Sequence, residues 1–170
     1  MKNSNIRKIE DYEDFATVFK VFEDYPFFES WSATELEEEF NMQRLNGEIF
    51  GYYIGRKCVG MISILPYRKG KHPVNFKNSK KVIYLSDIAV IHEYRGRGIA
   101  SELLEYVLYH TKVLGYKTIY LRTNKDISMV YQIAVKHGFT LMKGVEQDVE
   151  RIRIDGIVQK DTRIFLQKTL

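Results

Sequence analysis

The chain has 170 residues, of which 45% are hydrophobic, 28% charged and 14% aromatic, a composition that supports one globular domain with one core and excludes disorder. Its single cysteine, Cys58, excludes an intramolecular disulfide framework and a multi-cysteine metal cluster, and it suits a reducing compartment. The sequence has neither a secretory signal pattern nor an apolar run near ~18 residues, so we expect one cytoplasmic domain over residues 1–170 without a membrane partner.

The net charge of +4 is distributed unevenly along the chain. Residues 1–50 contain five Lys or Arg and twelve Asp or Glu, whereas residues 51–81 contain eight basic residues and no acidic one. The total favours anionic partners in general, but it does not separate nucleic acid from a phosphate-bearing cofactor. We therefore expect surfaces of opposite sign on one domain.

Residues 1–47 predict a short strand and two helices. A strand around residues 6–9 precedes a helix that Asp11 caps and whose apolar residues recur at helical spacing. Those apolar residues are Tyr12, Phe15, Ala16, Phe19 and Phe22. A second, acidic helix begins at the capping box of Ser32 and Glu35 and continues to about Asn46, before Gly47.

Residues 49–90 predict three strands and a basic loop. Residues 49–54 and 58–65 predict two strands that a turn at residues 55–57 joins like a hairpin. Residues 68–81 are polar, basic and aperiodic, so we expect them to form a solvated surface loop. The third strand follows at residues 81–90.

The C-terminal half alternates between strands and helices. A four-turn amphipathic helix covers residues 99–114 and ends at Gly115, and a strand follows at residues 117–123. A helix capped by Asp126 comes next, with Ile127, Val130, Tyr131 and Ala134 on one face, before strands at residues 139–145 and 163–168. The order β-α-α-β-β-β-α-β-α-β-β predicts an α/β protein with a mixed sheet, parallel pairing near its end and helices on both faces.

The turn between the strand at 81–90 and the helix at 99–114 predicts an anion site. Residues 95–98, Arg-Gly-Arg-Gly, precede a helix with no Ser, Thr, Asp or Asn at its cap, so its first N–H groups lack a side-chain partner. The glycines allow close approach of the backbone, and the arginines and the helix dipole favour negative charge. A P-loop is excluded because Ile99 follows Gly98, and a Rossmann fingerprint because Ser101 replaces its third glycine.

The remaining pattern is Arg-x-x-Gly-x-Ala, formed by Arg95, Gly98 and Ala100. Together with the strand at 84–90 and the helix that ends in Lys-His-Gly-Phe at 136–139, it resembles the GNAT superfamily of acetyl-CoA-dependent N-acetyltransferases. The resemblance is strongest over residues 84–139, and the element order of the whole chain also fits. It implies a GNAT-like acyl-CoA N-acyltransferase fold.

The resemblance implies acetyl-CoA as cosubstrate and no metal. In the family, the amides of the turn hold the cofactor's pyrophosphate. The adjacent strand splays from its neighbour, pairs with the pantetheine arm and places an N–H near the thioester oxygen. The implied cofactor-binding residues are Ile88, Ala89, Val90, Arg95, Gly96, Arg97, Gly98, Ile99, Ala100, Ser101 and Asn124.

The general acid departs from the family pattern. Family members often carry a tyrosine as proton donor to the thiolate at a position that Ala134 occupies here. Tyr131 lies three residues earlier on the same helical face, and it is our candidate for the catalytic acid. A tyrosine packed in the core with its hydroxyl at the edge is the alternative.

The general base is equally open. Many relatives place a glutamate on the strand before the turn, where this chain offers Tyr84 and Ser86. Asp87 is the only carboxylate on that strand and is our candidate base, although strict alternation puts it opposite Ser86 unless a bulge intervenes. A structural role for Asp87, a base at Glu29 and a water chain are alternatives.

The acceptor region implied by the resemblance is the pair of N-terminal helices and the loop between them. This region is acidic and aromatic, and our candidate substrate-binding residues there are Tyr25, Phe28, Glu29 and Trp31. Carboxylates and aromatic faces suit a cationic amine. Exposed acids and core aromatics provide a plainer explanation of the same composition.

The other reactive residue types predict no further chemistry. His72, His92, His110 and His137 show no ligand spacing, so we expect surface histidines and no metal site. Cys58 is expected to be a small buried strand residue.

The leading hypothesis is an N-acetyltransferase that acts on a primary amine by direct attack in a ternary complex. The acceptor is a small-molecule or peptide amine, with a cationic small molecule as one candidate, and the enzyme is a monomer or a homodimer. One alternative is a CoA-binding regulator with a decayed site, suggested by Ala134. Another is a nucleic-acid-binding module that uses the basic loop 68–81, although we do not expect a nucleic-acid partner.

Overall fold

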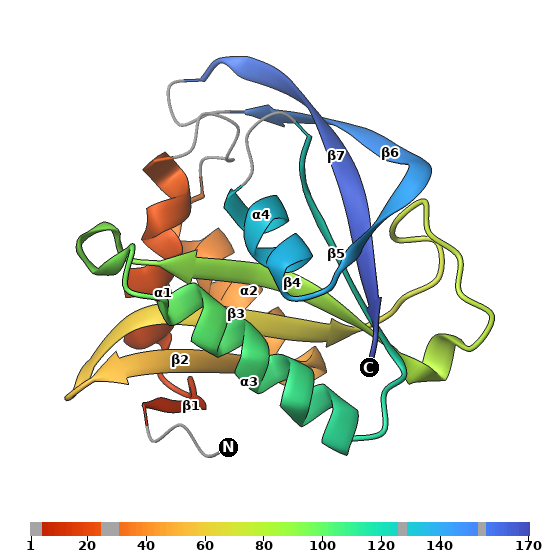
Figure 1. The fold of residues 1–170 in the computed structure, drawn as a ribbon. Helices are drawn as coiled ribbons and strands as arrows, with labels where there is room; N and C mark the ends of the chain where they lie inside the picture. Colours follow the sequence, from red (N-terminus) through yellow and green to blue (C-terminus); the bar gives the residue numbers. More distant parts are fainter. Residues whose placement is uncertain (1–4, 25–30, 126–128, 153–155) are drawn as a thin grey trace.

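The computed structural model describes residues 5–24, 31–125, 129–152 and 156–170. Within these ranges the chain forms a seven-stranded sheet and four α-helices (Figure 1). The strands are β1 (Ile6–Lys8), β2 (Glu48–Ile54), β3 (Lys57–Pro66), β4 (Val82–Val90), β5 (Thr118–Asn124), β6 (Thr140–Ile152) and β7 (Val158–Thr169). The helices are α1 (Tyr12–Phe19), α2 (Ala33–Asn46), α3 (Ile99–Val113) and α4 (Met129–Lys136), with 3-10 turns at Lys20–Asp24, Ser79–Lys81 and His92–Tyr94.

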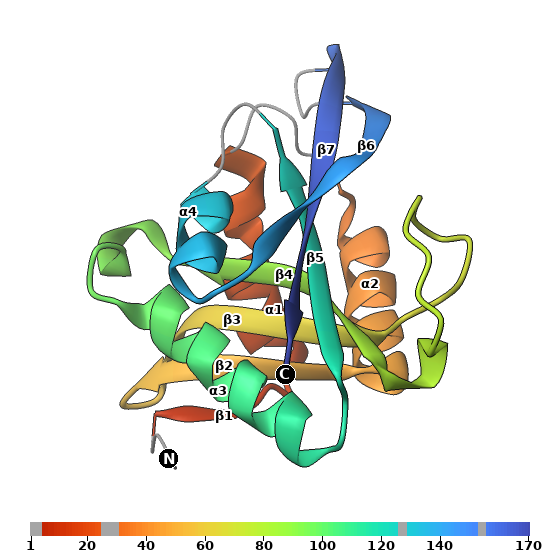
Figure 2. The same cartoon turned by 45° about the vertical axis from the view of Figure 1, so that its right-hand side comes forward.

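The sheet is mixed, with the strand order β1-β2-β3-β4-β5-β7-β6. The neighbours β4 and β5 are parallel, and the other neighbouring pairs are antiparallel. Helices α1 and α2 cover one face, called the α1/α2 face below, while α3 and α4 cover the other, the α3/α4 face (Figures 1 and 2). The predicted element order and the mixed α/β class are confirmed.

Apolar residues from the helices fill a core layer on each face. On the α3/α4 face, Leu103 and Val107 of α3 pack with Ile119 of β5, and all three are completely buried. On the other face, Phe15 of α1 packs with Phe40 of α2, with their ring centroids 5.2 Å apart. Each such side chain contributes roughly 1.5–3 kcal/mol through burial, so both layers hold the sheet in place between its helices.

The helix starts follow the local signals of the sequence. Asp11 caps α1, with Oδ1 accepting from the Glu13 amide at 2.7 Å. The capping box of α2 is complete, because the Ser32 amide donates to Glu35 Oε2 at 2.7 Å and the Glu35 amide donates to Ser32 Oγ at 3.2 Å. Helix α1 is shorter than predicted, since the chain tightens into the 3-10 turn Lys20–Asp24 after Phe19.

The end of the sheet differs from the predicted parallel pairing. The crossover β4-α3-β5 does give a parallel pair, but β6 pairs with β7 and not with β5. Strand β7 lies between β5 and β6 and is antiparallel to both. Both strands are also longer than the predicted 139–145 and 163–168, since charged residues alternate along their outer ends and conceal the strand pattern.

The basic loop is only partly solvated, contrary to our expectation. Tyr67, His72 and Val74 are buried and pack onto the α1/α2 face against Tyr84 and Tyr120. The His72 ring lies 4.7 Å from that of Tyr84, and its Nδ1 is 3.1 Å from the Tyr120 hydroxyl. The prediction that His72 lies on the surface is therefore wrong: its flat ring fills a slot between aromatic side chains, while the lysines of the loop remain exposed.

Candidate active site

Strands β4 and β5 pair over only half of their length. The parallel ladder ends at Leu85 and Leu121, after which β4 continues for five more residues and β5 for three. Beyond that point, within the described ranges, β4 pairs only with β3 and β5 only with β7, and the two strands diverge (Figure 1). The backbone of Ile88, Ala89 and Val90 therefore has one edge without a ladder partner, which an extended ligand can use as a strand would.

The turn after β4 is shaped by its two arginines and two glycines. Arg95 Nε donates to the carbonyl of Val90 at 3.0 Å, and Arg97 Nη2 donates to the carbonyl of Glu93 at 3.2 Å. Gly96 and Gly98 have φ angles of 74° and 82°, a backbone region that residues with a Cβ rarely adopt. A Cβ at either glycine would meet nothing within 4 Å, so the turn is open on the side where a ligand would approach.

The first amides of α3 face the open side of this turn. Gly98 is the N-cap and offers no side chain, and the first helical bond runs from the Glu102 amide to the Gly98 carbonyl at 3.0 Å. Among the described residues, the amides of Ile99, Ala100 and Ser101 have no backbone or side-chain acceptor. Free N–H groups, a helix dipole and two nearby guanidinium groups suit the binding of phosphate oxygens, and cofactor binding at this turn stays a prediction.

A β-bulge decides where the Asp87 carboxylate lies. In the β3–β4 pairing, Ser63 is opposite Asp87 and Ile64 is opposite Leu85, so Ser86 has no partner. The extra residue turns Asp87 toward α2, where its Oδ2 accepts from Gln43 Nε2 at 2.7 Å and from Ser63 Oγ at 2.9 Å. Within the described part of the chain, Oδ1 makes no hydrogen bond and remains available to a ligand.

Gln43 holds this carboxylate from the core of α2. Its side chain is completely buried, and the same Nε2 also donates to Glu39 Oε1 at 2.6 Å. The sequence analysis missed Gln43, although a signal was present: it extends the buried series formed by Leu36 and Phe40 at helical spacing. A polar residue at such a core-facing position implies a specific partner.

Tyr84, the other candidate position on β4, is unsuited to act as a base. Burial raises the pKa of its hydroxyl, which therefore keeps its proton at neutral pH. The ring stacks on Tyr120 with a centroid separation of 4.9 Å, and it belongs to the aromatic cluster beneath the basic loop. Asp87 is thus the carboxylate of β4 and the better candidate on this strand.

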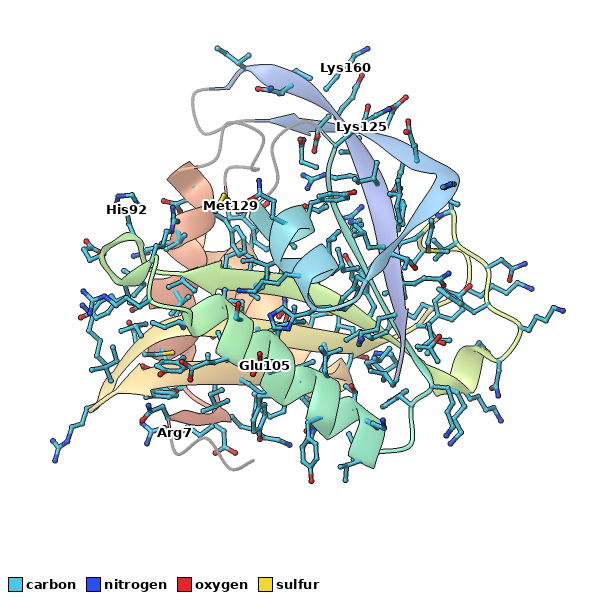
Figure 3. The ribbon with its side chains drawn as sticks, in the orientation of Figure 1. Arg7, His92, Glu105, Lys125, Met129 and Lys160 are labelled. Carbon is cyan, nitrogen blue, oxygen red and sulfur yellow. The ribbon has the colours of Figure 1, made fainter. Side chains whose placement is uncertain are left out.

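Tyr131 lies on α4, on the sheet face opposite Asp87. It is half-buried and packs against the α3/α4 core together with Val130. His137 directly follows α4, and its Nδ1 lies 3.8 Å from Oε1 of Glu105 on α3, a residue that Figure 3 labels. Ala134 is completely packed, at 1% exposure. Tyr131 therefore lies on the α3/α4 face of the sheet, and its role as an acid stays a prediction.

Asn124, the remaining predicted cofactor ligand, is buried at the end of β5. Its Nδ2 donates to Asp161 Oδ1 of β7, and Asp161 Oδ2 is 2.5 Å from Arg163 Nε. The side chain therefore braces β5 against β7, and its contact with a cofactor stays a prediction.

The predicted acceptor residues are described only in part. Tyr25, Phe28 and Glu29 lie outside the described residues, as do the predicted cap Asp126 and Ile127. Trp31 is half-buried, with its ring 5.5 Å from that of Phe19, and it packs against the cluster that contains Ala89 of β4. It therefore lies on the α1/α2 face, the same face as Asp87.

The cysteine and the histidines form no metal site in the described residues, where no group of three potential ligands is found. Cys58 is buried, as predicted, and burial raises the pKa of its thiol to about 11. His110 is half-buried, unlike our expectation, because its Nε2 lies 2.7 Å from Glu48 Oε2 and its ring packs on Phe50. No described helix is long and apolar enough to cross a membrane.

The chain is similar to known proteins in sequence pattern and in fold. Residues 12–139 match the profile of the Acetyltransferase (GNAT) family. An N-acetyltransferase from Staphylococcus aureus Mu50 superposes with a TM-score of 0.72 at 19% identity, covering 96% of both chains. The ribosomal-protein-S18-alanine N-acetyltransferase from Escherichia coli gives 0.69 at 16% identity, over 96% of this chain and 92% of that one.

A third solved structure carries a ligand. The protein yncA from Salmonella typhimurium, solved with its cofactor acetyl-CoA, superposes with a TM-score of 0.69 at 14% identity, over 97% of this chain and 92% of that one. No curated protein sequence gives a significant match. At these identities the structural matches establish the fold.

Proposed function

The chain belongs to the GNAT acetyltransferase family, and from this membership we propose that it transfers an acetyl group from acetyl-CoA to a primary amine by direct attack in a ternary complex. The observation that carries the proposal is the separation of β4 from β5 directly beside the glycine turn at the start of α3. An unpaired strand edge and an open anion site lie at the two ends of one short segment, residues 88–101.

The residues present fit acetyl-CoA. The amides of Gly96, Gly98 and the first turn of α3 bind the pyrophosphate, and Arg95 and Arg97 add positive charge beside it. The free backbone edge of β4 pairs with the pantetheine arm. When bound, acetyl-CoA supplies an acetyl group activated as a thioester, and an N–H of this edge stabilises the developing oxyanion.

Asp87 removes the proton that keeps the acceptor amine unreactive. An alkylamine with a pKa near ~10.4 is neutral in only about 0.1% of molecules at pH 7.4, so the attacking form must be generated in the site. Gln43 and Ser63 fix one carboxylate oxygen of Asp87 and leave Oδ1 for the ammonium. Two fixed hydrogen bonds hold the carboxylate in one orientation, which proton transfer requires.

Tyr131 is the candidate proton donor to the departing thiolate. The demand on this acid is small, because a thiol with a pKa near ~8.5 leaves more readily than an alkoxide. A half-buried tyrosine on α4, across the sheet from Asp87, separates the acid from the base. The acceptor then enters from the α1/α2 face, where Trp31 lies.

A panel of primary amines, followed by release of free CoA thiol, tests this function. The Asp87→Asn variant should lose about 100-fold or more in kcat near pH 7, while its Kd for acetyl-CoA stays within about twofold of wild type. Asp148→Asn on β6 is the matched control, because Asp148 is exposed and contacts Thr162, away from the opening.

Two outcomes would contradict the proposal. If the Asp87→Asn variant keeps the wild-type kcat, Asp87 is not the general base. Tight acetyl-CoA binding without thiol release for any amine would contradict an enzyme altogether and would favour a CoA-binding regulator, for which the packed Ala134 is the supporting feature.

A further inference from the structure

A half-buried arginine lies beside the opening between the strands. Arg122 is the first residue of β5 after the last one paired with β4. Strand alternation puts it on the same face as Tyr120, which is the α1/α2 face, where Asp87 also lies. The sequence analysis did not single out Arg122, because one arginine in a strand is ordinary.

Neutral groups hold this guanidinium. Nη1 donates to Gln147 Oε1 of β6 at 3.1 Å. Among the residues that the structure describes, no carboxylate lies within ion-pair distance of Arg122, whereas Arg163 on the neighbouring strand β7 lies 2.5 Å from Asp161. A partly buried cation with no counter-ion is complementary to an anionic ligand. The planar guanidinium matches a carboxylate in particular, since it can donate two parallel hydrogen bonds.

Arg122 and Asp87 flank the same tyrosine without pairing with each other. Both charges act on the hydroxyl of Tyr84, whose pKa burial raises, Arg122 lowers and Asp87 raises further. Their Cα atoms lie on strands that are roughly 5 Å apart where the ladder ends and diverge beyond it. Each charge is held by neutral neighbours, Gln147 for Arg122 and Gln43 with Ser63 for Asp87. The site therefore presents a negative and a positive group that both act on the hydroxyl of one tyrosine, Tyr84.

Building on the proposed acetyl transfer, we propose that the acceptor is an amino acid or a similar small zwitterion, whose ammonium group contacts Asp87 and whose carboxylate contacts Arg122. A simple alkylamine leaves the guanidinium without a counter-ion, and a polyamine places a second cation against it. The N-terminus of a protein is also a poorer fit, because its nearest carboxyl group is an amide. Arg122 is then a specificity-determining residue and takes no part in proton transfer.

Matched pairs of acceptors test this inference. Each pair contains an acid and its neutral counterpart: alanine and alaninamide, 3-aminopropanoate and propylamine, 4-aminobutanoate and butylamine. For at least one pair the wild-type enzyme should favour the acid by about tenfold or more in kcat/KM, the range expected for a hydrogen-bonded charge pair. In Arg122→Gln that ratio should fall to within about twofold of one. The Arg56→Gln variant, in the exposed turn between β2 and β3, should keep the wild-type ratio.

The outcomes separate this inference from the function on which it rests. Acetylation of neutral amines with no preference for any acid, or a preference that survives in Arg122→Gln, overturns the inference alone. Failure of every amine of both kinds overturns the proposed function, and this inference with it. Thermal melting and acetyl-CoA binding verify that Arg122→Gln is folded. If the variant is unfolded, the kcat/KM ratios of the wild-type enzyme alone test the inference. A wild-type enzyme that prefers no acid over its neutral counterpart overturns the role of Arg122.

Discussion

Replacement of Gly98 by leucine isolates the contribution of the turn to cofactor binding. Gly98 has φ 82° and caps α3 without a side chain, and a Cβ there would meet nothing within 4 Å. The substitution therefore destabilises the folded protein only by the cost of holding a residue with a Cβ in the left-handed backbone conformation, about 1–2 kcal/mol. That cost corresponds to a fall of roughly 2–8 °C in Tm for a protein of this size.

The effect on binding should be much larger than the effect on folding. The leucine side chain would extend into the open side of the turn and displace the anion from the first amides of α3. Loss of two charge-assisted hydrogen bonds at ~1.5–3 kcal/mol each weakens binding by about 3–6 kcal/mol, which is roughly 10²- to 10⁴-fold in Kd. Calorimetric titration with acetyl-CoA measures this loss directly.

Gly70→Leu is the matched control for this prediction. Gly70 has φ 86°, nothing lies within 4 Å of a Cβ there, and the residue is in the exposed part of the basic loop. Its Tm should fall as much as that of Gly98→Leu, while its affinity for acetyl-CoA stays at the wild-type value. A folded Gly98→Leu protein that binds acetyl-CoA within about threefold of wild type would refute the assignment of the phosphate site.

Two further predictions concern buried titratable side chains. Burial lowers the pKa of His72 from 6.5 to about 4, so the unfolded chain binds a proton that the folded chain excludes, and stability is lost as pH falls from about 6.5 toward 4. Over this window wild type should lose about 3 kcal/mol more than His72→Phe in urea unfolding, and equal losses would contradict a neutral buried His72. Burial raises the pKa of Cys58 to about 11, so Cys58→Ala should keep kcat within about twofold; a tenfold loss in a folded variant would argue for a covalent acyl-enzyme instead of direct attack.

The order of the elements and the glycine turn with its uncapped helix start could be predicted because their signals are local. The Ser32 and Glu35 capping box, the apolar stripe of α3 and the glycines at 96 and 98 each act within one or two turns of chain. The GNAT resemblance rests on this glycine turn together with the strand and helices of residues 84–139. These features depend on backbone conformation and hydrogen bonding between near neighbours, and a single sequence encodes both.

The parts that could not be predicted depend on contacts between distant residues. Alternation alone left the face of Asp87 open, and the unpaired Ser86 settles it through the register of β3 against β4. The basic loop was expected to be solvated, yet the His72 side chain is buried against Tyr84 of β4 and Tyr120 of β5. Strand β7 takes the place beside β5 that the βαβ pattern gave to β6.

The sequence by itself therefore determined the element order, the helix caps and a glycine turn that leaves the first amides of α3 without a side-chain cap. Only the tertiary structure decided which side chains gather on the α1/α2 face: Gln43 and Ser63 on Asp87, and Arg122 on the same face without a carboxylate partner among the described residues. The reason is physical. Propensity, capping and glycine conformation act over a few residues, whereas strand register and the pairing of buried charges are set by packing between segments tens of residues apart.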